Sequence, residues 1–221
     1  MRTRAVVSIL GVSATTLISG FILWGMLFGG QDVTSFGLGG MFLVSMLSHL
    51  TMVARDIFVP LFLQLTPLYN PILLSLVAGV GGAIGDVSAY ALGWGVSESL
   101  GGKSKTDDLV GRWVNRYGLW AVLIVAATPL PDLPIVMLVG SKRLPFRKLL
   151  VAEAAGKVAL YSVGAFFGGS IFEALIGTVG NLTASALVVV VSVAFTFLIT
   201  WGPSRDYLFG LIEKLIPSGR S

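Results

Sequence analysis

The sequence predicts an all-α integral membrane protein, an inverted repeat with two opposed re-entrant helical loops and about four full transmembrane helices. Three observations support this fold class. The composition is 55% hydrophobic and only 12% charged, so the chain has too little polar surface for water. Basic residues gather in short clusters between apolar segments, and one short motif occurs twice. At about 20 apolar residues per crossing, the length allows one compact membrane domain over residues 1–221.

The composition also excludes several functional classes. The absence of cysteine excludes disulfides, thiolate catalysis and zinc–sulfur sites, and the single histidine, His49, cannot build a multi-histidine metal centre. We therefore expect no metal and no cofactor. The net charge of +4 comes from dispersed clusters without a continuous basic face, so no nucleic-acid partner is expected. No nucleophile elbow is present, and we expect no enzyme activity.

The first predicted span covers residues 5–28. Arg2 and Arg4 precede it, which places the amino terminus in the cytoplasm. A cleaved signal peptide is the alternative, but the apolar stretch is longer than a usual signal core. The next clear span, 71–94, leads into the basic segment 98–116, so that its first residue, Pro71, is expected outside.

Residues 31–70 must then begin and end on the same side of the membrane, because the first span ends outside and the next span begins there. Two apolar runs, 36–54 and 57–65, flank the adjacent charges Arg55 and Asp56. We interpret them as a re-entrant loop with these charges at its tip and with Pro60 distorting the second limb. Arg55 could receive an anionic headgroup and Asp56 a proton, or the two could form a self-contained ion pair at the interface.

Residues 119–140 are also expected to begin and end on the same side of the membrane, because basic residues flank them at both ends. The middle of this segment contains three prolines and Asp132 and cannot continue as a regular helix; the prolines are Pro129, Pro131 and Pro134. We interpret it as a second re-entrant loop from the opposite face. For either loop, a pair of short tilted spans is the alternative, because it would also leave both ends on one side of the membrane. Asp132 is a candidate for proton exchange, and capping of the second half-helix is its alternative role.

A dense basic cluster follows the second loop: Lys142, Arg143, Arg147 and Lys148. It could attract phosphates of anionic lipids or act only as a topology signal. The chain is then expected to cross outward over 149–172, return over 184–201 and end in a cytoplasmic tail, 203–221, with a possible amphipathic helix. Both termini are thus expected in the cytoplasm. The two loops with their spans form the units 36–95 and 118–172.

An internal repeat links these units. At an offset of 71 residues, Gly85-Asp86-x-x-x-Tyr90-x-x-Gly93 aligns with Gly156-Lys157-x-x-x-Tyr161-x-x-Gly164. Each copy lies in the span after a re-entrant loop, and the two spans run in opposite directions, as in an inverted repeat. Asp86 and Lys157 are therefore predicted partners near the midplane, either as a structural ion pair or as part of a substrate or proton pathway. The glycines favour close helix packing.

Two further polar residues have simpler predicted roles. Glu153 lies four residues before Lys157, which predicts a helix-stabilising pair. His49 is expected to be a packing residue, since no second histidine accompanies it.

The run 81–93, the Pro129-Leu130-Pro131 sequence and the segment 140–150 together resemble the DedA or VTT-domain (SNARE-associated) membrane family, in particular a small Pro-Leu-Pro branch. The resemblance covers roughly residues 40–170. It implies two facing re-entrant loops, lipid transport as the activity and the plasma membrane of a prokaryote as the location. In this family an arginine of the second loop can recognise phosphate. No arginine occupies the second loop here, so the resemblance does not imply phosphate recognition of that kind.

The sequence and the resemblance together favour a scramblase-like or flippase-like lipid translocase. Phospholipids or polyprenyl-phosphate lipids would be the partners, and Asp86, Lys157 and Asp132 would line or gate the path. No nucleotide motif is present, which favours downhill or proton-coupled transport. The alternatives are a proton-coupled exporter of small molecules and a membrane scaffold that transports nothing. The sequence leaves the oligomeric state open, a homo-oligomer included.

Overall fold

The computed structural model describes residues 2–28, 33–52, 54–99, 114 and 117–201. Within these ranges all regular structure is helical. The main helices are α1 (Arg2–Phe28), α2 (Gly37–Leu50), α3 (Val59–Leu65), α4 (Pro71–Gly85), α5 (Val87–Ser99), α7 (Leu119–Ala126), α8 (Leu133–Ser141), α9 (Phe146–Val163), α10 (Gly169–Val179) and α11 (Asn181–Thr200). Short helical turns add η1 (Val33–Phe36), η2 (Arg55–Phe58) and the π-helical turn η3 (Gly164–Gly168). The predicted tail, 203–221, lies outside the described residues.

Two helical rods in the described part of the chain are long and apolar enough to cross a membrane. One is Pro71–Ser97, formed by α4 and α5, and the other is Phe146–Val179, formed by α9, η3 and α10. The Asn70 side chain begins the first rod by accepting a hydrogen bond from the Ile72 N–H at 2.9 Å. These rods correspond to the second and third predicted spans.

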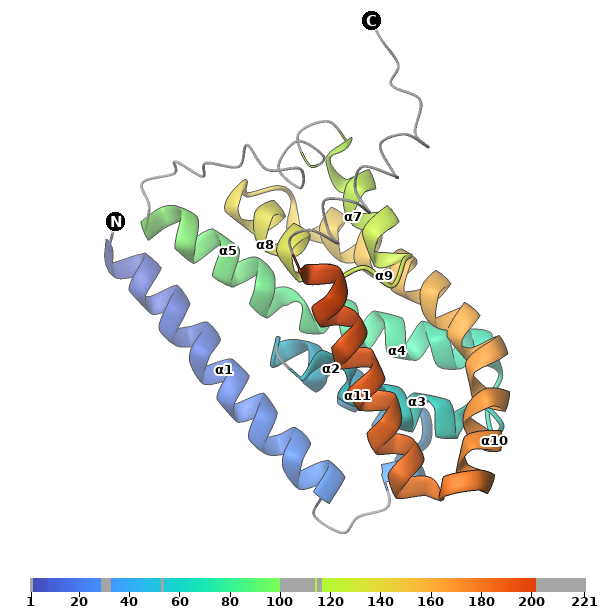
Figure 1. The fold of residues 1–221 in the computed structure, drawn as a ribbon. Coiled ribbons are helices and arrows are strands. Elements are labelled where there is room, and N and C mark those ends of the chain that lie inside the picture. Colours follow the sequence, from blue (N-terminus) through green and yellow to red (C-terminus); the bar gives the residue numbers. More distant parts are fainter. Residues whose placement is uncertain (1, 29–32, 53, 100–113, 115–116, 202–221) are drawn as a thin grey trace, which may run out of the picture.

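α1 and α11 correspond to the two remaining predicted spans. Both expose large apolar side chains, with Phe21 80% and Leu182 85% exposed. A surface of this kind suits lipid rather than water. In Figure 1 the start of α1 and the ends of α5 and α11 lie toward the top, whereas the end of α1 and the turn from α10 to α11 lie at the bottom.

The first predicted loop is a helical hairpin of α2 and α3 with η2 at its tip. Its two ends meet, because η1 contacts α3 and a Cβ at Gly37 would contact the Tyr69 hydroxyl group. The predicted role of Pro60 is wrong. It does not distort the second limb but lies in the first turn of α3, where a backbone N–H would have no acceptor within the helix.

The second predicted loop is a hairpin of α7 and α8. Pro129 and Pro131 lie in its tip, and Pro134 lies in the first turn of α8. Asp132 occupies the N-cap position of α8, but its side chain makes no capping hydrogen bond. The capping role considered for this side chain is therefore wrong, because the carboxylate is engaged elsewhere, as described below.

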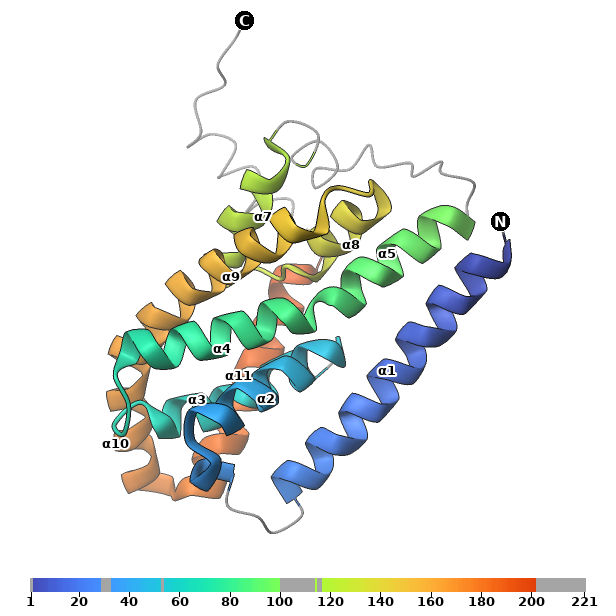
Figure 2. The same cartoon turned by 180° about the vertical axis from the view of Figure 1, so that it is seen from behind.

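The two rods and the two hairpins pack in a reciprocal way (Figures 1 and 2). α4 crosses α9 at the centre, α2 packs on α4 and α7 packs on α9. In addition, α8 packs on α5 and α3 packs on α10. Each hairpin thus places its first limb on the rod that follows it in the chain and its second limb on the other rod.

Glycines allow these close crossings. A Cβ at Gly79 would lie 2.9 Å from the Val158 backbone nitrogen, where α4 meets α9, and a Cβ at Gly156 would lie 2.8 Å from the Leu123 carbonyl oxygen, where α9 meets α7. Both distances are shorter than real Cβ contacts. The predicted packing role of the repeat glycines is confirmed at Gly156.

Two apolar clusters form the core, one around α2, α3 and α4 and one around α5, α7, α8 and α9. The tips of the two hairpins contact charged side chains of both rods, as described next.

Candidate functional site

Five charged side chains meet where the two hairpin tips approach the rods. We call them the charged cluster: Arg55, Asp86, Asp132, Glu153 and Lys157. They come from the tip of the first hairpin, the junction between α4 and α5, the tip of the second hairpin, and α9. All five side chains are largely removed from solvent, with exposures from 1% to 14%.

Lys157 is the centre of the charged cluster. Its Nζ lies 2.9 Å from Asp86 Oδ2 and 3.1 Å from Glu153 Oε2, and it also forms an ion pair with Asp132 Oδ2. Glu153 and Lys157 are one helical turn apart on the buried face of α9. That face, together with Gly156, allows α9 to bring a cation into contact with the hairpins.

Arg55 joins the two carboxylates from the other side. Its Nη1 lies 2.7 Å from Asp132 Oδ1, and its Nη2 pairs with Asp86 Oδ1. The planar guanidinium group suits such a bridge because its nitrogens point in fixed directions. The self-contained pair with Asp56 is therefore not the arrangement in the structure, since Arg55 contacts carboxylates of two other segments.

The predicted partnership of Asp86 and Lys157 is confirmed as an ion pair, but it is not an isolated one. Each of Asp86 and Asp132 forms ion pairs with both cations, whereas Glu153 pairs with Lys157 alone among the described residues. The sequence prediction of Glu153 as a helix-stabilising residue captured its spacing to Lys157. It missed that the Glu153 side chain is 1% exposed and belongs to the cluster.

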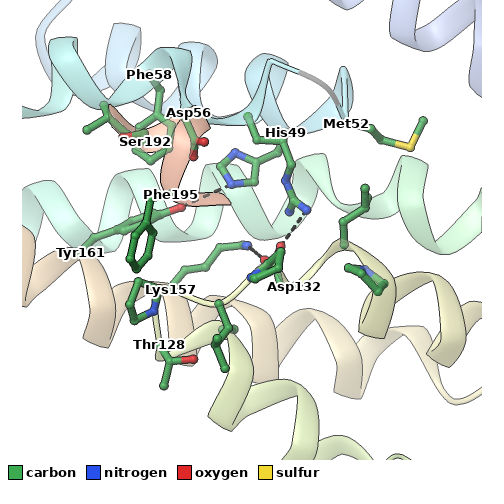
Figure 3. A pocket seen from close by; sticks show the side chains of 18 residues that line it. His49, Met52, Asp56, Phe58, Thr128, Asp132, Lys157, Tyr161, Ser192 and Phe195 are labelled. Carbon is green, nitrogen blue, oxygen red and sulfur yellow. Dashed lines mark hydrogen bonds and ion pairs between the residues drawn. The ribbon is translucent and has the colours of Figure 1, made fainter. Parts of the chain in front are cut away.

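A cavity of about 330 Å³ opens beside the charged cluster. Both hairpin tips line it, and α11 adds Ser192 and Phe195 (Figure 3). Three members of the cluster reach its wall, namely Arg55, Asp132 and Lys157, and Asp56 lines it as well. Most of the predicted pathway residues thus share one cavity, and Asp86 lies directly behind them.

His49 and Tyr161 form a second polar pair on the cavity wall. His49 Nδ1 lies 2.8 Å from the Ser45 carbonyl oxygen, and its Nε2 lies 3.3 Å from the Tyr161 hydroxyl oxygen. A carbonyl can only accept, so Nδ1 carries a proton, and in the neutral imidazole Nε2 accepts from the Tyr161 hydroxyl group. The Tyr161 ring also packs on Phe58, with ring centroids 5.2 Å apart.

His49 is buried, as a packing residue would be, but the sequence analysis missed its place on the cavity wall. The signal was weak because one histidine on an apolar helix has no sequence neighbour that marks it. The two repeat tyrosines differ in their position, because Tyr161 lines the cavity and Tyr90 does not. The Tyr90 hydroxyl donates to the Leu144 carbonyl oxygen at 2.9 Å, and Tyr90 does not line the cavity.

The basic cluster at residues 142–148 lies apart from the cavity. It covers the end of α8, the turn and the start of α9, and none of its four basic residues lines the cavity wall. Arg143 lies over the Trp94 ring at 5.8 Å. Whether this cluster binds headgroups or only sets topology stays a prediction.

The carboxylates of the charged cluster could in principle hold a metal ion. Oxygens of Asp86, Asp132 and Glu153 lie within 4.8 Å of one another. The Lys157 ammonium group contacts all three, so it occupies the centre that an ion would need. This donor set does not fit a metal ion in the present arrangement.

One comparison with known proteins, the one with family models, agrees with a helical membrane fold. The family model of the VTT domain matches residues 57–170, more than half of the chain, and the match includes both hairpin second limbs and four of the five cluster residues. No curated protein and no solved structure matches the chain. On the strength of the family match, the chain belongs to the VTT-domain family of DedA-type membrane proteins.

Proposed function

We propose that the protein translocates lipids between the two leaflets of its membrane. The headgroup would pass through the cavity between the hairpin tips, while the acyl chains stay in the bilayer. The observation that carries this proposal is a cavity of about 330 Å³ with charged side chains from both tips on its wall, inside a fold whose outer helices expose large apolar side chains.

The packing of the hairpins supports a path at the membrane midplane. Each hairpin returns toward the side on which it begins, and the reciprocal packing of limbs on rods is what an inverted repeat requires. In this interpretation both hairpins are re-entrant, and their tips face each other. Polar backbone at that depth is tolerated where it lines a hydrated cavity.

Arg55 is the best placed group for a lipid phosphate. Its side chain is 14% exposed, against 3% for Lys157, and it lines the cavity. A guanidinium group recognises phosphate by paired hydrogen bonds. The headgroup phosphate would compete with Asp86 and Asp132 for Arg55, so we expect binding to be weak enough to permit release on either side.

Transport would run downhill or be coupled to an ion, because the chain carries no nucleotide-binding motif. A proton is the simplest coupling ion, and Asp56 and Asp132 are the carboxylates that reach the cavity wall. Charged groups at membrane depth commonly mark such pathways.

Lipid movement in liposomes tests the proposal. Purified protein is reconstituted with fluorescent phospholipids or a fluorescent polyprenyl phosphate, and the fraction that becomes accessible to a membrane-impermeant quencher is followed. We expect faster movement with the wild type than in empty liposomes, loss with Arg55→Gln, and no loss with Glu173→Gln, whose side chain is exposed on α10.

Other functions predict different results. A proton-coupled exporter would leave all lipids in place but carry a small amphipathic cation, detected as uptake into vesicles with an imposed proton gradient. A scaffold would move neither lipid nor solute. Absence of protein-dependent movement for every lipid would contradict the translocase proposal.

A further inference from the structure

The charged cluster does not balance its own charge. Two cations, Arg55 and Lys157, face three carboxylates, which gives a formal net charge of −1 in a region largely closed to solvent. A buried charge without a partner is costly in any protein and more so at membrane depth. We infer that Glu153 holds a proton that balances the cluster, and that this residue is an exchangeable proton-binding site.

The contacts single out Glu153 among the three carboxylates. Asp86 and Asp132 are each shared between Arg55 and Lys157. Within the part of the chain that the structure describes, the only ion-pair partner of Glu153 is Lys157, at 3.1 Å, and this contact is not geometrically a hydrogen bond. Its Oε1 has no hydrogen-bond partner at all within the described part of the chain. Glu153 is also the most buried carboxylate, with its side chain 1% exposed.

The surroundings of Glu153 offer no other compensating charge among the described residues. The charged groups that face it are Lys157 from its own helix, Asp86 from the α4–α5 junction, Asp132 from the second hairpin and Arg55 from the first. Two of these are negative, and both positive groups are already committed to Asp86 and Asp132. A neutral carboxyl at position 153 therefore leaves two cations and two carboxylates.

A proton fits this position better than a metal ion or a cationic headgroup. The Lys157 ammonium group already fills the space among the carboxylates, and Glu153 does not line the cavity. The groups between it and the cavity are Lys157 and Asp132, which do line the wall. A proton can move from group to group along these contacts to Glu153, whereas a metal ion or a headgroup cannot.

The exchange step conserves charge and protons. The Lys157 ammonium group gives a proton to the Glu153 carboxylate, breaking one N–H bond and forming one O–H bond. Lys157 then takes a proton from the cavity side, by way of Asp132 or water. The net result is the uptake of one proton, and the formal charge of the cluster rises from −1 to zero.

The proton site follows from the geometry alone, whereas its coupling to lipid movement rests on the proposed function. If a headgroup phosphate draws Arg55 away, Asp86 and Asp132 share a single cation. The proton on Glu153 then prevents a larger negative charge from developing, so lipid movement requires the protonated form.

Infrared spectroscopy tests the proton site without reference to transport. The full-length protein in lipid is titrated with base, and the carbonyl stretching band of protonated carboxyl groups is followed. We expect one such band at neutral pH that disappears at alkaline pH, that is absent from Glu153→Gln and that persists in the control Glu173→Gln. Absence of the band at neutral pH, or its persistence in Glu153→Gln, would overturn the proposal.

Folding of the variants is informative in itself, because glutamine resembles a protonated glutamate. We expect Glu153→Gln and the apolar, similarly sized Glu153→Met to be monodisperse in detergent. If both fail to fold while Glu173→Gln folds, Glu153 acts as a charged structural residue and the proposal is wrong.

Lipid movement tests the coupling. We expect wild-type movement to fall at alkaline pH by about tenfold and Glu153→Gln to keep its rate over the same range. An unchanged pH dependence in Glu153→Gln would overturn the coupling. If the wild type moves no lipid, the proposed function fails, while the infrared result still decides the proton site.

Discussion

Lys157 Nζ lies 2.9 Å from Asp86 Oδ2 and ties α9 to the junction between α4 and α5. The two residues occupy equivalent positions in the repeated motif, so the ion pair joins the two halves of the fold. Asp86 also pairs with Arg55, and Lys157 also pairs with Asp132 and Glu153. The pair is therefore one edge of a network rather than an independent contact.

This network predicts that exchanging the two charges does not restore the protein. Asp86→Lys alone should lower the stability by about 3–5 kcal/mol, the typical cost of breaking a buried pair. Adding Lys157→Asp restores the pair but places a lysine beside Arg55 and an aspartate beside Asp132 and Glu153. We expect the double variant to be no more stable than the single ones, as measured by thermal unfolding in detergent.

The neutral variant Asp86→Asn serves as the control for this experiment, since it removes a charge without adding a like one. We expect it to be more stable than Asp86→Lys. Recovery of the wild-type melting temperature by the double variant would contradict the network and support a simple two-residue pair.

Arg55 gives a second prediction because it contacts two carboxylates through different nitrogens. Lysine keeps the charge but has one nitrogen and cannot reproduce this geometry. We expect Arg55→Lys to fold and to slow lipid movement by about tenfold, equivalent to about 1.4 kcal/mol of transition-state stabilisation. Wild-type rates in the liposome assay would show that charge alone suffices at this position.

The sequence was sufficient to locate the hairpins because the positions of the charges restrict them. Basic segments that are expected on the same side of the membrane predict an even number of crossings between them, and Pro129 and Pro131 mark the tip of the second loop. The observed limbs, α2 with α3 and α7 with α8, lie where this argument places them. The repeat also identified Asp86 and Lys157 as partners, since equivalent positions in two packed spans lie close together.

Other contacts between segments far apart in the chain could not be predicted in this way. Nothing near Arg55 in the sequence indicates that it bridges Asp86 and Asp132, and the adjacent Asp56 suggested a local pair instead. Glu153 and His49 were missed for a similar reason. A spacing of four residues predicts helix contact, and burial of Glu153 arises only when α9 packs against two hairpins.

Glycines at the crossing of α5 and α8 provide a prediction about stability alone. A Cβ at Gly93 would overlap the Met137 backbone, and a Cβ at Gly140 would overlap the Tyr90 backbone. Backbone cannot move aside as a side chain can, so Gly93→Ala should destabilise the protein by about 1–3 kcal/mol. Gly11→Ala on α1, where the new Cβ meets nothing within 4 Å, should leave the melting temperature equal or higher. Equal melting temperatures for the two variants would contradict the close packing of α5 on α8.

The two repeat tyrosines should differ in function. Tyr161→Phe removes the hydroxyl that reaches His49 on the cavity wall, whereas Tyr90→Phe removes a hydrogen bond to the Leu144 carbonyl outside the cavity. Each loss should cost about 0.5–1.5 kcal/mol of stability. Only Tyr161→Phe should slow lipid movement, by about threefold to tenfold, and similar rates for the two variants in liposomes would argue against a role for the His49–Tyr161 pair.

The absence of native cysteine allows single introduced cysteines to test on which side of the membrane the two ends of each hairpin lie. Phe36 and Leu68 lie at the two open ends of the first hairpin and are 54% and 68% exposed. If the hairpin is re-entrant, Phe36→Cys and Leu68→Cys react with a membrane-impermeant maleimide added to the same side of oriented vesicles. Trp120→Cys in the first turn of α7 and Arg147→Cys in the first turn of α9, which flank the second hairpin in the chain, react only from the other side. Labelling of positions 36 and 68 from opposite sides would mean that the segment crosses the membrane, and the two tips would then no longer enclose a midplane cavity from opposite faces.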